Sequence, residues 1–175
     1  MDGIDISTIS RQTVRSNITT VPQDPFFVPT MTLRHTLLSG SMGGDVSDSQ
    51  LAGALESVGL LQHAIIHLCK KSDGKKEDAI KSILDATISA LPLSAGQQQL
   101  FCLARALLQD KKIVILDEVT SAMDVATEER LCMVLRNGLK GKTVLMVAHR
   151  PKMLGICDFV VEIDAGMVVG VIEKE

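Results

Sequence analysis

A run of four apolar residues followed by two adjacent acids constrains the fold of this chain more than any other feature. Residues 113–116 read Ile-Val-Ile-Leu and lead directly into Asp117 and Glu118. A short, continuous apolar run is typical of a strand that is buried on both faces of a parallel sheet. An acid at the carboxyl end of such a strand lies at the edge where α/β sheets bind ligands. The pattern predicts an α/β fold with Asp117 and Glu118 at a ligand site.

The sequence around this strand alternates between helical and strand patterns. Residues 97–108 and 127–137 each carry apolar side chains along one helical stripe, and an apolar strand at 143–148 follows the second stripe. A β-branched segment at 17–21 predicts another strand, and the tail at 159–172 predicts a hairpin. This alternation favours a parallel sheet within one domain, as expected for a chain of 175 residues.

The pattern is predominantly helical between residues 28 and 92. Ser47 and Gln50 have the spacing of a capping box at the start of a helix predicted over 48–58. The stretch 70–78 mixes both charges around a glycine, which predicts a solvated loop. We therefore expect a mainly helical segment between the first strand and the central one.

Charge and composition exclude several classes of protein. Eighteen Lys and Arg residues against 21 Asp and Glu residues give a net charge of −3, too small to indicate a nucleic-acid partner. The four cysteines are too far apart for a CxxC pair and too few for a disulfide-rich scaffold, so we expect reduced intracellular thiols. No apolar segment approaches the roughly 20 residues of a membrane helix, and the N-terminus has no signal-peptide pattern. Any membrane role is expected to come through a partner.

The two acids and a second motif point to phosphate chemistry. Asp117 would face a Mg²⁺ ion on nucleotide phosphates while Glu118 polarises the attacking water, a division of labour that phosphoryl transfer requires. The alternative is that the two acids cap the next helix. Ser94 lies at the start of the helix predicted over 97–108, where free backbone N–H groups, the helix dipole and the hydroxyl form an anion site. A plain capped helix would have a similar sequence.

Five motifs, in order, resemble those of the ATP-binding cassette (ABC) ATPases of membrane transporters, over essentially the whole chain. Residues 21–25 are similar to the family's Q-loop and residues 93–97 to its signature. Residues 113–118 resemble its Walker B motif, 121–124 its D-loop, and His149 its switch histidine. The phrases DGIDISTISRQTVRSNITTVPQDP and QLFCLARALL are most similar to the second nucleotide-binding domain of multidrug-resistance-associated (C subfamily) exporters.

The resemblance implies a P-loop NTPase-like (RecA-like) parallel sheet, with an inserted helical subdomain at about 28–92 and a core at about 93–175. It implies ATP and Mg²⁺ as cofactors and ATP hydrolysis coupled to transport as the activity. The implied partners are a second nucleotide-binding domain, in a dimer, and the transmembrane domains of an exporter. The chain would lie at the cytoplasmic face of a membrane, or be soluble in the cytoplasm if expressed alone. Its transported substrate would be set by transmembrane helices that this sequence does not contain.

The same resemblance implies roles for individual residues. Gln23 would help Asp117 to hold Mg²⁺ and would couple the nucleotide to the transmembrane domain. The catalytic set would be Gln23, Glu118 and His149, with His149 at the γ-phosphate. Asp124 would cross the dimer interface. The full nucleotide-binding set is Ser94, Ala95, Gly96, Gln97, Asp117 and Asp124.

The sequence departs from the family pattern at one major motif. The P-loop, G-x-x-x-x-G-K-[ST], is expected before Gln23 and occurs nowhere in the sequence. Residues 141–143, Gly-Lys-Thr, lack the first glycine and precede a strand, so we interpret them as a turn. The sequence also has no Trp or Tyr to stack on adenine. We expect a cassette without its N-terminal strands and P-loop, with exposed apolar edges and little or no ATP hydrolysis of its own.

Two functions are open for such a chain. Ser94 and Gly96 could complete the ATP site of a partner cassette in trans, although Ala95 stands where many members carry glycine. The chain could instead be a non-catalytic remnant or an interaction module. DNA-repair ATPases of the SMC type share some motifs, but the sequence has none of their sustained heptads. His63 and His67 have the spacing of zinc ligands without a third ligand, so a structural or exposed pair is expected.

Overall fold

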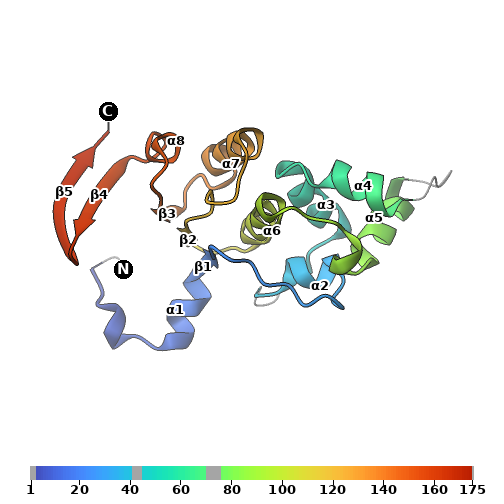
Figure 1. The fold of residues 1–175 in the computed structure, drawn as a ribbon. Helices are drawn as coiled ribbons and strands as arrows, with labels where there is room; N and C mark the ends of the chain where they lie inside the picture. Colours follow the sequence, from blue (N-terminus) through green and yellow to red (C-terminus); the bar gives the residue numbers. More distant parts are fainter. Residues whose placement is uncertain (1–2, 41–44, 70–75, 175) are drawn as a thin grey trace.

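Three parallel strands form the sheet at the centre of the molecule (Figure 1). The computed structural model describes residues 3–40, 45–69 and 76–174. The strands that pair side by side, in the order β1-β2-β3, are β1 (Ile18–Val21), β2 (Ile113–Asp117) and β3 (Thr143–Val147). Val21 lies opposite Leu116, and Asp117 lies opposite Val147. The carboxyl ends of all three strands therefore reach the same edge of the sheet, and the predicted α/β fold is confirmed.

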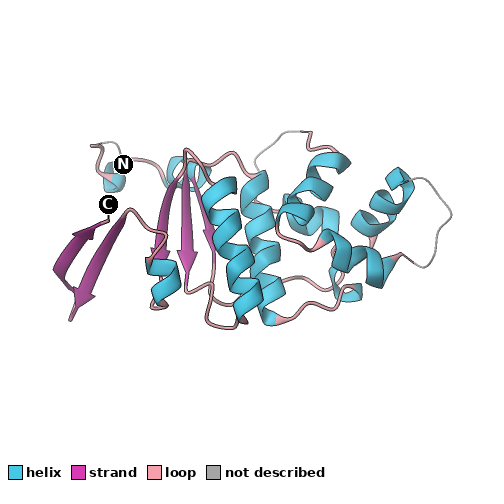
Figure 2. Ribbon diagram, turned by 90° about the horizontal axis from the view of Figure 1, so that it is seen from above, coloured by secondary structure: helices cyan, strands magenta, loops and turns pink. Residues whose placement is uncertain are grey.

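Two long helices pack beside one another against this sheet. Figure 2 shows α6 (Ala95–Leu108) and α7 (Val125–Gly138) between the sheet and the helices of the 33–85 segment. On α6, Phe101 and Leu103 are fully buried. Burial of such an apolar stripe supplies most of the stability of a helix of this length, because helix propensity alone is too weak. The packing of α6 and α7 thus fixes the side of the sheet on which residues 93–97 and 121–124, at the starts of these two helices, lie.

A group of four helices occupies the stretch predicted to be helical. These helices are α2 (Leu33–Leu38), α3 (Asp48–Ser57), α4 (Leu61–Leu68) and α5 (Lys76–Asp85). Arg34 on α2 forms ion pairs with Asp48 at the start of α3 and with Asp85 at the end of α5. Ser47 and Gln50 form the predicted capping box of α3. One guanidinium and the shared core therefore hold three of these helices together.

The remaining elements lie at the opposite side of the sheet and at the end of the chain (Figure 1). They are η1 (Ile6–Thr8), α1 (Arg11–Asn17), α8 (Pro151–Leu154), β4 (Phe159–Asp164) and β5 (Met167–Glu173). One more short helix, η2 (Ile88–Ala90), follows the four-helix group in the chain. β4 and β5 form the predicted antiparallel hairpin. Ala165 and Gly166 both have positive φ, at 49° and 78°, as a two-residue hairpin turn of type I′ requires.

The predicted elements differ from the observed ones mainly at their ends. The first strand starts at Ile18, because Asn17 belongs to α1, which the sequence pattern did not reveal. The predicted loop at 70–78 is wrong for its last three residues, which form the first turn of α5, and residues 70–75 lie outside the described part of the chain. Glu77 and Asp78 favour that turn because acids are stabilised at a helix N-terminus.

The expected exposure of apolar strand surface is also found. Val144, Leu145 and Val147 on β3 are 36%, 57% and 56% exposed. β3 lies at one edge of the sheet, with β2 as its only partner among the described strands. The described ranges contain no single helix that is long and apolar enough to cross a membrane, and α3 with α4 reach that length and composition only as a pair bent by 108°.

Candidate functional site

Three predicted site residues follow the carboxyl ends of three adjacent strands. Gln23 lies two residues beyond β1, Glu118 one residue beyond β2, and His149 two residues beyond β3. Because the strands are parallel and in register, these residues meet at one edge of the sheet. This convergence places a carboxylate, an amide and an imidazole in one group.

The carboxylate of Glu118 lies between the other two side chains. Nε2 of Gln23 donates a hydrogen bond to its Oε2 over 3.1 Å. Its Oε1 is 4.0 Å from Nδ1 of His149, too long for a direct hydrogen bond. The side chains of Glu118 and His149 are 36% and 66% exposed. The Glu118 carboxylate is therefore oriented by one amide and accessible to water.

The backbone turns sharply at Glu118. Its φ is 43°, in the left-handed region that a non-glycine residue seldom adopts, and its N–H donates to the main-chain oxygen of Val147 over 3.1 Å. This conformation costs about 1–3 kcal/mol and is concentrated at functional sites. The turn ends β2 and directs the chain after Asp117 away from the direction of the strand. Neither acid caps the next helix, since Asp124 does so, and the predicted alternative of a capping pair is not found.

The residues predicted to hold Mg²⁺ offer suitable oxygen atoms. Asp117 is exposed at the end of β2, and the side-chain oxygen of Gln23 is distinct from the Nε2 that binds Glu118. Mg²⁺ prefers oxygen ligands and commonly uses one or two protein groups together with phosphates and water. The described residues contain no group of three or more His, Cys, Asp or Glu side chains that could hold a metal ion. The oxygen atoms of Asp117 and Gln23 are thus of the kind that the predicted ion requires.

The predicted anion site is the first turn of α6. Oγ of Ser94 accepts from the N–H of Gln97 over 3.2 Å, and Oε1 of Gln97 accepts from the N–H of Ser94 over 2.9 Å. The Ser94 oxygen acts as an acceptor, so its hydroxyl proton remains free to be donated outward. Ser94 and Ala95 are exposed, and the first N–H groups of a helix have no partner within the helix. The turn can therefore present donors and a positive dipole end to an anion.

Gly96 has a packing role that the sequence did not reveal. A Cβ on Gly96 would lie 3.3 Å from Met123 Cγ and Thr127 Cγ2, and 3.5 Å from the main-chain oxygen of Ala122. Gly96 is buried, and the position that a Cβ would occupy faces Ala122 and Met123 in the segment 121–124. The absence of a Cβ allows α6 to approach that segment closely.

Asp124 is engaged in capping α7. Its Oδ1 accepts from the N–H of Thr127 over 2.7 Å. This backbone hydrogen bond lowers the pKa of the Asp124 carboxyl below its ordinary value, so the group is charged at neutral pH. Asp124 and Gly96 thus lie on two segments in contact with each other, and Asp124 is exposed.

Two residues near the site were missed at the sequence level. Gln99 on α6 is buried, and its Nε2 donates to the main-chain oxygen of Gln23. Arg150, next to His149, donates to Glu128 Oε2 over 3.2 Å and to the main-chain oxygen of Met123 over 3.4 Å. A polar residue on the apolar stripe of α6 is the signal that could have identified Gln99.

Three further features of the sequence could be mistaken for sites. Gly141, with φ 78°, forms the predicted turn before β3, and Lys142 donates to the main-chain oxygen of Gln109 over 2.8 Å. The rings of His63 and His67 are 4.4 Å apart. All four cysteines are free thiols, and burial raises the pKa of three of them, Cys102, Cys132 and Cys157.

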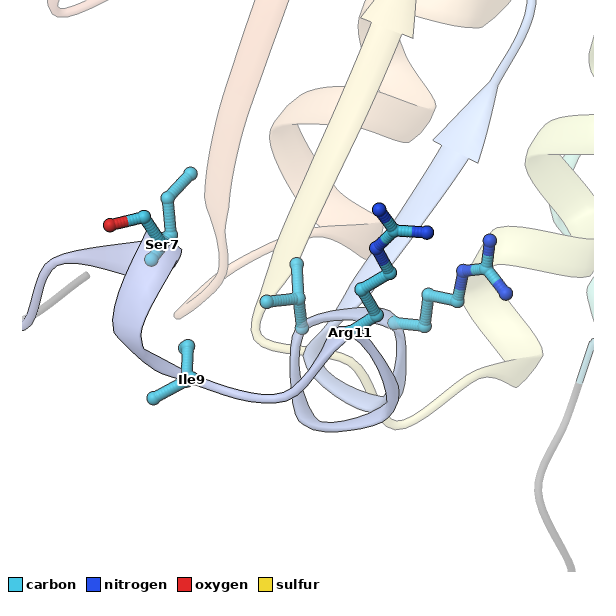
Figure 3. A pocket seen from close by; sticks show the side chains of 6 residues that line it. Ser7, Ile9 and Arg11 are labelled. Atoms are coloured by element: carbon cyan, nitrogen blue, oxygen red, sulfur yellow. The ribbon is translucent and has the colours of Figure 1, made fainter.

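A cavity lies away from this group. It measures about 420 Å³ and sits beside η1 and α1, where Figure 3 shows Arg11 extending from α1 and Ser7 and Ile9 from the preceding segment. Its lining residues are Ile6, Ser7, Ile9, Arg11, Val14 and Arg15. None of the predicted site residues lines it, and its arginines are on the surface.

Comparison with known proteins shows the family of this chain. The family model described as ABC transporter matches residues 1–121. The fold is similar to that of a bacterial Atm1-family ABC exporter with ATP bound, at a TM-score of 0.76 and 23% sequence identity, over 97% of this chain and 27% of that chain. This likeness supports the α/β fold.

The sequence of this chain is similar, over almost its whole length, to segments of several fungal transporters. ABC transporter gloK of Glarea lozoyensis is 38% identical over 97% of this chain and 11% of its own length. ABC multidrug transporter B of Aspergillus fumigatus is 38% identical over 97% of this chain and 10% of its own length. The ATP-dependent bile acid permease of Saccharomyces cerevisiae is 32% identical over 96% of this chain and 10% of its own length. The chain thus spans about a tenth of the length of these relatives. The match to the family model and the identity to these relatives show that the chain belongs to the ABC transporter family.

Proposed function

We propose that these residues form part of the ATP-binding and ATP-hydrolysing machinery of an ABC exporter and power substrate transport. The observation that carries the proposal is the meeting of Gln23, Glu118 and His149 at the carboxyl edge of a parallel sheet. Hydrolysis of a phosphoanhydride needs a group that accepts a proton from water and a donor that faces the γ-phosphate. The three side chains offer both.

Each side chain has a distinct role in this proposal. Glu118 accepts a hydrogen bond from the attacking water at Oε1, the carboxylate oxygen that Gln23 leaves free. Gln23 fixes the orientation of that carboxylate through Oε2. His149 is sufficiently exposed to donate a ring N–H to a phosphate oxygen. Asp117, with the side-chain oxygen of Gln23, would hold Mg²⁺, which on binding would neutralise developing phosphate charge.

The first turn of α6 is proposed to serve a different ATP molecule from the Glu118 group. In the ABC family two cassettes enclose ATP, and the signature of one completes the site of the other. Ser94 and Ala95 are exposed at the start of α6, as a contact with a partner's nucleotide requires. Because the sequence has no P-loop motif, we expect the chain alone to bind Mg·ATP poorly and to act through a partner cassette.

The proposal also assigns the larger segments. The helical subdomain at about 28–92 would contact the transmembrane part of an exporter, and the core at about 93–175 would carry Glu118 and His149, with Gln23 contributed by the loop after β1. The assembly would lie at the cytoplasmic face of a membrane, with a second cassette as its dimer partner. Resemblance to the C subfamily stays a prediction, as does the transported substrate.

The test is a reconstituted pair. A complete ABC cassette, made inactive as a homodimer by replacing its own signature serine with arginine, is mixed with the 175-residue chain in Mg·ATP. We expect the wild-type chain to restore hydrolysis, because Ser94 completes the partner's site. Ser94→Arg should not restore it, whereas the matched variant Glu118→Gln should, since Glu118 belongs to the other site. Equal restoration by Ser94→Arg would refute the trans role.

Calorimetry separates this function from that of an autonomous ATPase. Mg·ATP is titrated into the purified chain, with Glu118→Gln as a parallel sample. The proposal expects no saturable binding up to about millimolar ATP, the weak end of the affinity scale for nucleotides. Saturable binding at about micromolar ATP would contradict it and would point to a phosphate site other than a P-loop.

A further inference from the structure

A buried glutamine on α6 is bonded to the loop that carries Gln23. Gln99 is 2% exposed, and its Nε2 donates to the main-chain oxygen of Gln23. Its Oε1 is buried and has no hydrogen-bond partner among the described residues. A buried amide is costly unless it is bonded, so a polar residue at this position calls for a reason beyond packing. The bond to Gln23 is that reason.

Gln23 is thereby held at both ends. Its main-chain oxygen accepts from Gln99, and its side-chain Nε2 donates to Glu118 over 3.1 Å. Pro22 and Pro25 on either side of this loop have no N–H, which leaves the loop few backbone donors with which to anchor itself. The position of Gln23 relative to Glu118 therefore depends on where α6 holds its main chain.

The helix that holds Gln23 also carries the exposed signature turn. Ser94 caps α6, and Gln99 lies about one and a half turns further along the same helix. Phe101, fully buried on α6, makes an edge-to-face contact with Phe27, with ring centroids 5.4 Å apart, so a second contact joins α6 to the segment after β1. A well-packed helix of 14 residues moves as a unit, because its buried stripe cannot deform continuously.

We propose that Gln99 is a positioning residue that carries a displacement of the first turn of α6 to Gln23. The inference rests on the proposed function. When Ser94 engages a partner's nucleotide, α6 shifts, Gln99 moves the main chain of Gln23, and the hydrogen bond from Gln23 to Glu118 changes. The signature that serves one ATP site is in this way coupled, inside one chain, to the Glu118 group that serves the other.

The test uses a variant of similar volume and a matched control. Gln99→Met keeps the size of the side chain, loses the donor to Gln23 and removes the unpaired Oε1. Gln98→Met is the control, because Gln98 is the neighbouring glutamine and donates to the main-chain oxygen of Leu93 over 3.3 Å instead. Because the lost donor and the removed orphan acceptor oppose one another, we expect the thermal midpoint of Gln99→Met to stay close to that of the wild-type chain.

The first readout is the loop itself, without nucleotide. In Gln99→Met, the side-chain NH₂ signal of Gln23 should shift in NMR spectra, because the main chain that carries it loses its hydrogen bond from Gln99. In Gln98→Met that signal should match the wild-type chain. An unchanged Gln23 signal in Gln99→Met would overturn the positioning role.

The second readout is the response to a partner. In the unmutated chain, the side-chain amide signals of Gln99 and Gln23 should shift together when the signature-blocked cassette and Mg·ATP are added. The Gln23 shift should be lost in Gln99→Met. A Gln23 shift that persists in that variant would overturn the coupling, and so would a shift of Gln99 alone in the wild-type chain. The wild-type chain could show no response to the partner although the first readout is as expected. That result would refute the proposed function and, with it, the coupling. The contact between Gln99 and Gln23 would still stand.

Discussion

Gln23 donates a hydrogen bond from Nε2 to Oε2 of Glu118 over 3.1 Å, although 95 positions of sequence separate the two residues. The register of the sheet explains the contact. Val21 lies opposite Leu116, and each of the two contact residues follows its paired strand residue by two positions. A shift of one residue between β1 and β2 would separate them, so the contact reports the correct strand pairing as well as the site.

Removal of Arg150 should destabilise the fold through Glu128. The guanidinium binds Oε2 of Glu128, which is 6% exposed and whose Oε1 has no hydrogen-bond partner in the described part of the chain. Arg150→Ala leaves that charge unpaired, so we expect a loss of about 2–3 kcal/mol in the free energy of unfolding by urea. Adding Glu128→Gln to the variant should recover more than half of the loss. A double variant no more stable than Arg150→Ala would show that the charge is not the cause.

Truncation of Phe101 should be far more costly than truncation of Phe26. Phe101 is fully buried against Phe27, whereas Phe26 is 81% exposed. Phe101→Ala should lower the free energy of unfolding by about 3–5 kcal/mol, the usual cost of a buried phenyl ring. Phe26→Ala should change it by less than about 0.5 kcal/mol, as surface changes do. Similar losses in both variants would mean that α6 does not pack as described.

Two glycines in helices should respond in opposite directions to alanine. A Cβ on Gly53, in α3, would meet no atom of residues 3–40, 45–69 or 76–174 within 4 Å, so Gly53→Ala should stabilise the chain by about 0.5–1 kcal/mol. A Cβ on Gly96 would lie 3.3 Å from Met123 and Thr127, so Gly96→Ala should lower the thermal midpoint. It should also weaken restoration of hydrolysis in the reconstituted pair, since the segment 121–124 must shift. Stabilisation by both changes would contradict the close approach.

Acid should weaken the contact between α2 and α3. The hydrogen bond from Arg34 lowers the pKa of the Asp48 carboxyl below its ordinary value of 3.8, and Arg34 also pairs with Asp85, while the charge of Lys81 acts in the same direction. A carboxyl with a lowered pKa contributes stability that is fully present above the ordinary value and is lost as the pH falls through the lower folded value. Asp48→Asn should therefore be less stable than the wild-type chain at pH 7.

The control for this prediction is the pH dependence of the difference. Unfolding by urea is followed for both proteins between pH 7 and pH 2.5. The gap between wild type and Asp48→Asn should stay constant above about pH 5 and shrink below pH 3.8. A gap that is constant down to pH 2.5 would show that the charge of Asp48 does not support the fold.

The sequence was most informative where local patterns and tertiary packing agree. The apolar run before Asp117 predicted a buried parallel strand, and the capping box of Ser47 and Gln50 marked the start of α3, as observed. The capping box of Ser94 and Gln97 was not predicted, and α6 starts at Ala95, two residues before its predicted start. The boundaries of α1 and α5 were missed, because α1 has no apolar stripe of its own and the start of α5 depends on acids within a charged stretch.

The site residues were predictable individually, and their arrangement was not. Gln23, Glu118 and His149 were chosen by position after strands and by resemblance, whereas the strand register that joins them is a long-range property. The left-handed backbone of Glu118 has no local signal, since glutamate rarely adopts it. The bond from Gln99 to Gln23 depends on how α6 approaches the sheet, which no helical pattern specifies.

The most direct test of the hydrolytic role supplies a P-loop from outside. The 175 residues replace the equivalent segment of a complete fungal ABC exporter, and ATP hydrolysis is measured for the wild-type sequence and for Glu118→Gln. The account predicts an active wild-type chimaera and a fall in kcat of about 100-fold or more for Glu118→Gln, with a much smaller change in KM, as expected when a general base is lost. A Glu118→Gln chimaera that hydrolyses ATP at the wild-type rate would contradict the central claim.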